Sequence, residues 1–194
     1  MSYTISRYPV HLIDVVRAAD GSRVTIRPTL PQDIELQCAF FRALSGEARR
    51  QRFMSRLAEL PKALVERFAS IDYRSHVALL AEVIEDGRER MIGEARYVVD
   101  ASDPGTCEFA IAVADGCQGA GIARALLDRL ERHAAASGIR RMVADTLASN
   151  TAMIALARRV GYAVAISHQD ATLARLEKAL PTPAASPADR PMAA

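Results

Sequence analysis

The sequence predicts an α/β fold, in which helices flank a central sheet. Residues 107–113 form a short apolar run typical of a buried strand, and residues 122–137 then place apolar side chains at helical spacing. A second strand pattern at 141–147 and a second helical pattern at 150–160 repeat this order. Strands that alternate with helices in this way indicate a sheet covered by helices.

The remaining elements follow from local patterns. Pro31 favours the start of a helix, Ser45 favours a helix cap, and Asp86-Gly87 favours a hairpin turn. We therefore expect helices at 31–44, 46–54 and 61–68. We expect strands at 24–27, 76–83, 91–99, 163–168 and 171–176, which makes about seven strands in all.

The length of 194 residues suits one domain with a sizeable core. Residues 1–22 have weak periodicity and are expected to pack on the main domain, 23–180, as an extension. Residues 181–194 contain four prolines and many alanines, so we expect a disordered tail.

Composition excludes several classes of function. A net charge of +2 does not favour nucleic acid or a membrane surface, and neither a bilayer-spanning run nor a signal-peptide pattern is present. The three cysteines, Cys38, Cys107 and Cys117, are odd in number and lack metal-ligand spacing. We expect reduced thiols in a cytoplasmic protein without a metal.

The most informative segment is the loop at 113–123, between the apolar strand and the amphipathic helix. Gly116, Gly119 and Gly121 allow the backbone to approach a ligand closely, and the helix N-terminus favours an anion. The segment lacks the Gly-Lys-Ser/Thr of a P-loop, and Arg124 stands where the dinucleotide fingerprint has its third glycine. The loop therefore predicts a diphosphate site of another kind. The alternative is an ordinary strand-to-helix turn.

The pattern Gln118-x-x-Gly121-x-Ala123 resembles the pyrophosphate loop of the GNAT superfamily of acyl-CoA-dependent N-acyltransferases, and the order of elements over 108–164 resembles its core. The resemblance implies a mixed, mostly antiparallel twisted sheet of about seven strands flanked by helices, with acetyl-CoA as co-substrate. It implies that the pantetheine arm pairs with the backbone of the strand before the loop. The implied acetyl-CoA contacts are Ile111, Ala112, Val113, Gln118, Gly119, Ala120, Gly121, Ile122, Ala123 and Asn150.

A narrower resemblance covers about residues 8–177 and rests on segments of the first half: Ile26-Arg27-Pro28, Phe40-Phe41-Arg42-Ala43-Leu44-Ser45, Arg52-Phe53, Ile71-Asp72-Tyr73 and Ala78-Leu79-Leu80-Ala81. These are similar to the acetyltransferase module of bacterial protein lysine acetyltransferases. The resemblance favours a protein lysine as acceptor, and it places a catalytic glutamate at Glu108.

Glu108 is the expected general base, because an amine must lose a proton to attack a thioester. The apolar run around Glu108 predicts that it is buried, an environment in which a carboxylate becomes a stronger base. The alternatives are a strand-end glutamate that pairs with Arg96 or one that lies in solvent.

Other polar residues have weaker assignments. Many GNAT enzymes carry a tyrosine as general acid where this chain has Ala157, and nothing assigns that role to Tyr162. Asn150 suits a helix cap as well as a pantetheine contact. His76, His133 (on the polar face of its helix) and His168 are expected to be surface or partly buried residues.

The sequence thus favours an N-acetyltransferase that modifies a protein lysine. A small-molecule amine acetyltransferase and a catalytically weak acyl-CoA-binding regulatory module are the alternatives. The preferred acyl group and the oligomeric state stay open.

Overall fold

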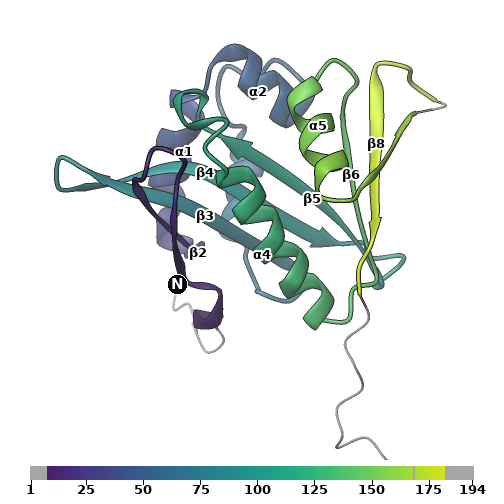
Figure 1. The fold of residues 1–194 in the computed structure, drawn as a ribbon, viewed down its shortest axis with the longest axis horizontal. Helices are drawn as coiled ribbons and strands as arrows, with labels where there is room; N and C mark the ends of the chain where they lie inside the picture. Colours follow the sequence, from purple (N-terminus) through teal and green to yellow (C-terminus); the bar gives the residue numbers. More distant parts are fainter. Residues whose placement is uncertain (1–7, 168, 182–194) are drawn as a thin grey trace, which may run out of the picture.

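The computed structural model describes residues 8–167 and 169–181. Its strands form one twisted sheet in the order β1-β2-β3-β4-β5-β6-β8-β7, with helices on both faces (Figure 1). The strands are β1 Asp14–Arg17, β2 Arg23–Pro28, β3 His76–Glu85, β4 Arg88–Val99, β5 Thr106–Val113, β6 Arg141–Leu147, β7 Ala163–Ile166 and β8 Leu173–Ala179. The helices are α1 Ile34–Ala43, α2 Gly46–Phe53, α3 Lys62–Ala69, α4 Ile122–Ala136 and α5 Thr151–Arg159, with 3₁₀ turns η1 Val10–Leu12, η2 Pro31–Asp33 and η3 Asp115–Cys117.

The predicted fold class is confirmed. Neighbouring strands of this sheet are antiparallel except β5 and β6, which run parallel. The sheet has eight strands rather than about seven, because β1 pairs with β2 at the edge. None of the helices in the described ranges has the length and apolar character needed to cross a bilayer.

Two hydrophobic clusters hold the helices on opposite faces of the sheet. Leu79 and Leu80 are neighbours on β3, yet Leu79 packs with Leu126 and Leu130 of α4, and Leu80 packs with Phe40 of α1. Strand side chains alternate between the two faces, which explains this division. Figure 1 shows α4 crossing one face of the sheet while α1 lies behind it.

Local signals place the element boundaries. Ser45 Oγ accepts the Ala48 N–H at 3.1 Å, which confirms the cap of α2. Asp86 and Gly87 have φ of 52° and 74°, as a tight turn between β3 and β4 requires. Gly138, with φ of 83°, ends α4 as expected.

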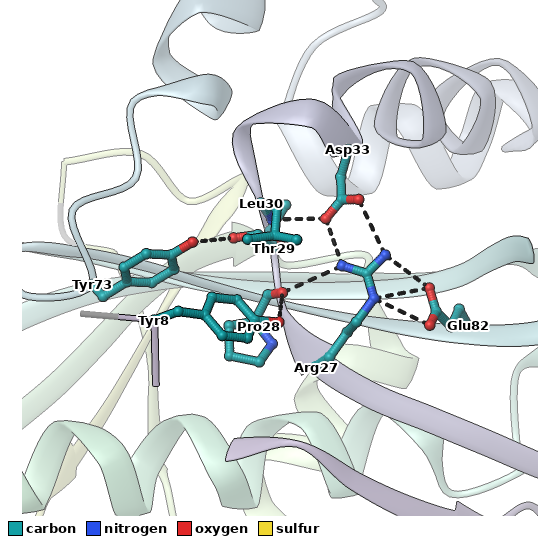
Figure 2. Close-up of polar contacts among 8 residues, drawn as sticks. All are labelled: Tyr8, Arg27, Pro28, Thr29, Leu30, Asp33, Tyr73 and Glu82. Atoms are coloured by element: carbon teal, nitrogen blue, oxygen red, sulfur yellow. Dashed lines mark hydrogen bonds and ion pairs between the residues drawn. The ribbon is translucent and has the colours of Figure 1, made fainter. Parts of the chain in front are cut away.

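A buried ionic cluster anchors the start of α1 (Figure 2). Arg27 on β2 donates to Asp33 at 2.6 Å and to Glu82 on β3 at 3.1 Å. The Tyr8 and Tyr73 hydroxyls donate to backbone carbonyls beside it, at 2.9 and 2.8 Å. The cluster therefore joins β2, β3 and the η2–α1 junction, and it sets where α1 lies on the sheet.

The structure corrects the predictions for His76 and His133, because both residues are buried. The Nδ1 of His133 lies 2.9 Å from the Tyr97 hydroxyl. Burial, together with the nearby His11, lowers the pKa of His133. The His11 ring of η1 stacks against the His133 ring at 6.1 Å, a contact that the sequence pattern of the helix alone does not reveal. His168 and the segment 182–194 lie outside the described residues.

Candidate functional site

The centre of the site is a divergence in the sheet. β5 pairs with β4 from Cys107 to Val113, but it pairs with β6 only from Thr106 to Glu108. Beyond Glu108 the strands β5 and β6 separate (Figure 1). Backbone groups on this side of β5 therefore face a gap instead of a neighbouring strand.

The alternation of backbone groups identifies which residues face the gap. The N–H of Ala114 donates to a β4 carbonyl at 2.8 Å, and the carbonyl of Gly105 accepts from the first β6 residue at 3.0 Å. Because backbone direction alternates along a strand, odd-numbered residues of β5 face β6. Ile111 and Val113 thus direct their N–H and C=O groups into the gap, whereas Ala112 directs its own toward β4.

The glycine-rich loop lies at the end of this gap. Gly119 and Gly121 have φ of 77° and 86°, and a Cβ at either would meet no atom within 4 Å. The loop is therefore open on that side. Gln118 Nε2 reaches back to the Val113 carbonyl at 3.4 Å, and the Ala120 carbonyl accepts an N–H from the β1–β2 turn at 3.2 Å.

The N-terminus of α4 completes the loop. Gly121 caps the helix, and its carbonyl accepts the Ala125 N–H at 3.0 Å. The N–H groups of the first helical residues, Ile122 and Ala123 among them, have no carbonyl one turn earlier in the helix. Their partial positive charge adds to the helix dipole, so this end of α4 favours an anion. The structure thus brings the predicted loop residues 118–123 together beside the end of β5.

Asn150 lies at the start of α5, which follows β6. Its side chain accepts the Met153 N–H at 3.1 Å, which confirms the predicted cap, and donates to Thr146 at 3.2 Å. The residue is buried. Its place after β6 puts it on the side of the gap opposite β5, where a pantetheine contact stays a prediction.

Glu108 departs from the prediction. Its side chain is exposed, not buried. The hydrophobic cluster beneath the helices on that face includes Met91 and Ala112 but not Glu108. Arg96 is not its partner, because that guanidinium binds Glu94 instead, at 2.5 Å. The Glu108 carboxylate is therefore accessible from solvent on this face of the sheet.

A buried charge cluster beside Ala112 was not predicted. Glu94 on β4 accepts from Arg52 of α2 and from Arg96, each at 3.1 Å, and the Arg96 guanidinium lies 3.6 Å from the Phe68 ring. Burial opposes ionisation of Glu94, but the charges of Arg96 and Arg52 outweigh it and lower the pKa of Glu94 to about 2. In the sequence, Glu94 and Arg96 alternate with apolar residues, a pattern that is typical of a strand with one solvent-facing side.

The cavity beside this cluster is small. Arg52, Glu94, Phe53 and Ala112 are among the residues that line about 10 Å³. Such a space holds at most a water molecule. A larger groove of about 420 Å³ lies elsewhere, between η1 and the second half of α4.

The structure places no proton donor at Ala157, which is buried in the core. Tyr162 is also buried, with its ring 5.2 Å from that of Phe109 and 5.4 Å from Lys178 Nζ. Burial raises the pKa of Tyr162. No group of three or more His, Cys, Asp or Glu side chains suited to a metal occurs in the part of the chain that the structure describes.

Comparison with known proteins identifies the family. The model of the acetyltransferase (GNAT) family matches residues 41–162, which include the whole divergence and the loop. The chain belongs to the GNAT acetyltransferase family. Members of this family use acetyl-CoA, which contains the diphosphate that the loop predicted.

Relatives of this GNAT chain extend the comparison. An acetyltransferase of Pseudomonas aeruginosa is 36% identical over 143 residues, which are 74% of this chain and 76% of the relative. The acetyltransferase Pat of Mycolicibacterium smegmatis is 30% identical over 146 residues, 75% of this chain but only 43% of Pat. The GNAT domain of PAT from S. lividans superposes with a TM-score of 0.82 at 30% identity, over 90% of this chain and all of that domain. The predicted resemblance to a protein acetyltransferase module is thereby confirmed.

Proposed function

We propose that this GNAT protein transfers the acetyl group of acetyl-CoA to a primary amine, with a protein lysine as the favoured acceptor. The observation that carries the proposal is that an open, glycine-rich helix N-terminus lies next to a stretch of β5 that does not pair with β6. The first suits a diphosphate, and the second suits the amide-bearing pantetheine arm.

In the proposed complex the diphosphate accepts hydrogen bonds from the loop Gln118–Gly121 and from the first turn of α4. The pantetheine arm lies in the gap and bonds to the backbone of Ile111 and Val113. A backbone N–H of β5 faces the thioester oxygen and stabilises the oxyanion, an interaction worth about 3–4 kcal/mol in other acyl transfers. Asn150 contacts the arm from the side of β6.

Glu108 is the proposed general base. The amine nitrogen attacks the thioester carbon while Glu108 takes its proton, and the C–S bond then breaks to release CoA thiolate. The sequence offers no general acid, so we propose that the thiolate takes its proton from water. Positioned proton transfer of this kind contributes about 10²–10⁴-fold.

Two features favour a lysine on a protein surface as acceptor. The Glu108 side chain is exposed, so a large surface can approach it. The cavity of about 10 Å³ nearby is too small for a metabolite. A small-molecule amine would need a closed pocket, which this side of the site would have to form on binding.

A catalytically weak acyl-CoA-binding module is the second candidate. It is favoured by Ala157, since a methyl group cannot donate a proton to the departing thiolate. Glu108 argues for catalysis instead, because its carboxylate is exposed and lies on the same strand as the proposed pantetheine contacts.

Labelled acetyl-CoA separates these candidates. The protein is incubated with [¹⁴C]acetyl-CoA and a cell lysate, and label in protein bands is compared with label in small molecules. Label in a few bands supports a protein lysine acceptor, whereas label only in small molecules supports a metabolite acceptor. Tight acetyl-CoA binding without any transfer supports the binding module.

A further inference from the structure

Helix α2 combines a small apolar contact with polar contacts at its two ends. Ala48 packs against the cluster of Phe40 and Leu44, the Phe53 ring lies 5.5 Å from the Phe41 ring, and the helix packs against β5 and β6. No residue of Gly46–Phe53 is buried as a whole, although the Arg52 side chain is only 10% exposed. Because apolar burial normally fixes a surface helix on a domain, the polar groups at the two ends add to a weak apolar contact in setting the position of α2.

At the N-terminal end, α2 is bonded to the loop of the site. The Ser45 N–H donates to Asp115 Oδ2 at 2.9 Å, and the Ser45 hydroxyl donates to Asp115 Oδ1 at 2.7 Å. The same hydroxyl oxygen accepts the Ala48 N–H and so caps α2. Asp115 begins η3, only three residues before Gln118 and the diphosphate loop.

At the C-terminal end, α2 is bonded to β4, the strand that pairs with β5. Arg52 donates to Glu94 at 3.1 Å, and Glu94 pairs in register with Ala112 of β5. The N-terminal end of the helix thus contacts the loop that the proposed function assigns to acetyl-CoA, and its C-terminal end contacts the strand next to β5.

The orientation of Asp115 is unexpected for a diphosphate loop. A carboxylate near an anionic ligand opposes binding unless other groups compensate for its charge. Here both carboxylate oxygens accept hydrogen bonds from Ser45, so the side chain is directed to α2. The hydrogen bonds from the Ser45 backbone and hydroxyl lower the pKa of Asp115 and keep it ionised.

We propose that Asp115 is a positioning residue that couples occupancy of the acetyl-CoA loop to the position of α2 on the acceptor side of the site. The coupling rests on the proposed function. Acetyl-CoA orders the loop, the ordered Asp115 holds Ser45, and α2 is fixed against β5 before the acceptor arrives. By linkage, an acceptor that needs α2 in this position also strengthens acetyl-CoA binding.

Amide hydrogen exchange of α2, measured with and without saturating acetyl-CoA, tests this coupling. The variants are Asp115→Ala and Ser45→Ala. Asp100→Ala is the matched control, because Asp100 also accepts a backbone N–H and a hydroxyl, both from Ser102, at 2.8 and 2.7 Å. Asp100 lies in the β4–β5 turn, away from α2. The acetyl-CoA Kd of each protein is measured by calorimetry.

In the wild type and in Asp100→Ala, acetyl-CoA is expected to slow exchange in α2. In Asp115→Ala, α2 is expected to exchange roughly 10-fold faster without ligand, and bound acetyl-CoA no longer slows it. The acetyl-CoA Kd of this variant stays within about threefold of the wild type, because a carboxylate rather than a donor is removed from the loop. A loop that had merely unfolded would lose acetyl-CoA affinity as well.

The proposal is overturned if α2 of Asp115→Ala exchanges its amide hydrogens at the wild-type rate. It is also overturned if bound acetyl-CoA still slows exchange of α2 in this variant. If the wild type binds no acetyl-CoA, the proposed function fails. The exchange of α2 in the ligand-free variants then still decides whether Asp115 holds the helix.

Discussion

A single carboxylate, Glu108, takes the proton of the attacking amine in the proposed reaction. Glu108→Gln keeps the shape of the side chain but removes the base, so we expect kcat to fall by about 10²–10⁴-fold. The acetyl-CoA Kd is expected to stay unchanged, because the carboxylate contacts the acceptor. Steady-state kinetics with the labelled protein substrate measures both effects.

Glu89→Gln is the matched control, since Glu89 is also an exposed strand glutamate but lies near the β3–β4 turn. It is expected to keep wild-type kcat. Undiminished turnover in Glu108→Gln would show that another group, or water, accepts the proton.

At the residue scale, the sequence predicts best what depends on neighbours in the chain. The positive φ of Gly119 and Gly121 and the cap by Asn150 follow from local chemistry. The exposure of Glu108 and the burial of His133 depend on which distant elements cover them. A sequence pattern shows the periodicity of a strand or helix, but it does not show what covers each face.

Among the elements, α2 and β4 are joined by the buried pair of Arg52 and Glu94. Glu94→Gln leaves two buried guanidinium groups without their anion, which is expected to cost about 3–5 kcal/mol of the free energy of unfolding at pH 7. Urea denaturation measures this difference. Asp145→Asn is the control: its ion pair with Arg175 is 35–42% exposed, and its loss is expected to cost at most about 1 kcal/mol.

The pH dependence of Glu94→Gln follows from the lowered pKa of Glu94, about 2. A carboxyl group whose pKa is lower in the folded than in the unfolded state stabilises the protein fully above its unfolded value, about 4.3. That stability is lost as the pH falls toward 2. The stability difference between wild type and variant is therefore expected to be constant from pH 7 to about 5 and to shrink below about 4.3. A difference that does not change down to pH 2 would contradict the assigned charge state.

Element boundaries were predictable where a cap or turn residue marks them, as at Ser45 and Asp86-Gly87. Strand β1 was not predicted, because its four residues carry a charge at each end and little alternation. It forms because β2 offers an edge for pairing. The Arg52–Glu94–Arg96 cluster could not be predicted either, because only the packing of helices on the sheet removes these charges from water.

For the whole molecule, the divergence of β5 and β6 predicts strong linkage between acetyl-CoA and stability. A ligand that bonds to both sides of the gap binds the folded state alone. At a concentration of 100 times Kd, acetyl-CoA is expected to add about 2.7 kcal/mol to the free energy of unfolding. For a chain of this size, the melting temperature would rise by roughly 5–10 °C.

Differential scanning calorimetry measures this shift, with ATP at the same concentration as control. ATP carries phosphates but no pantetheine arm, and it is expected to raise the melting temperature much less. Equal shifts with the two ligands would indicate phosphate binding without use of the gap.

At this scale, the α/β class and the order of elements were predictable from periodicity, and the loop identified the family. The place where the sheet opens was not predictable from the residues themselves. Strand pairing joins segments far apart in the chain, and its extent depends on the twist of the whole sheet. The pairing of β5 with β6 ends at Glu108, and no local pattern in β5 marks that point.

The most direct test of the account is acetyl-CoA binding by Gly121→Glu, measured by calorimetry. Gly87→Glu is the matched control, because both glycines have positive φ and neither Cβ would meet an atom within 4 Å. Each change strains the backbone by about 1–2 kcal/mol, but only Gly121→Glu places a carboxylate against the diphosphate. We expect Gly87→Glu to bind acetyl-CoA like the wild type and Gly121→Glu to lose binding. Equal affinity in the two variants would contradict the assignment of the loop.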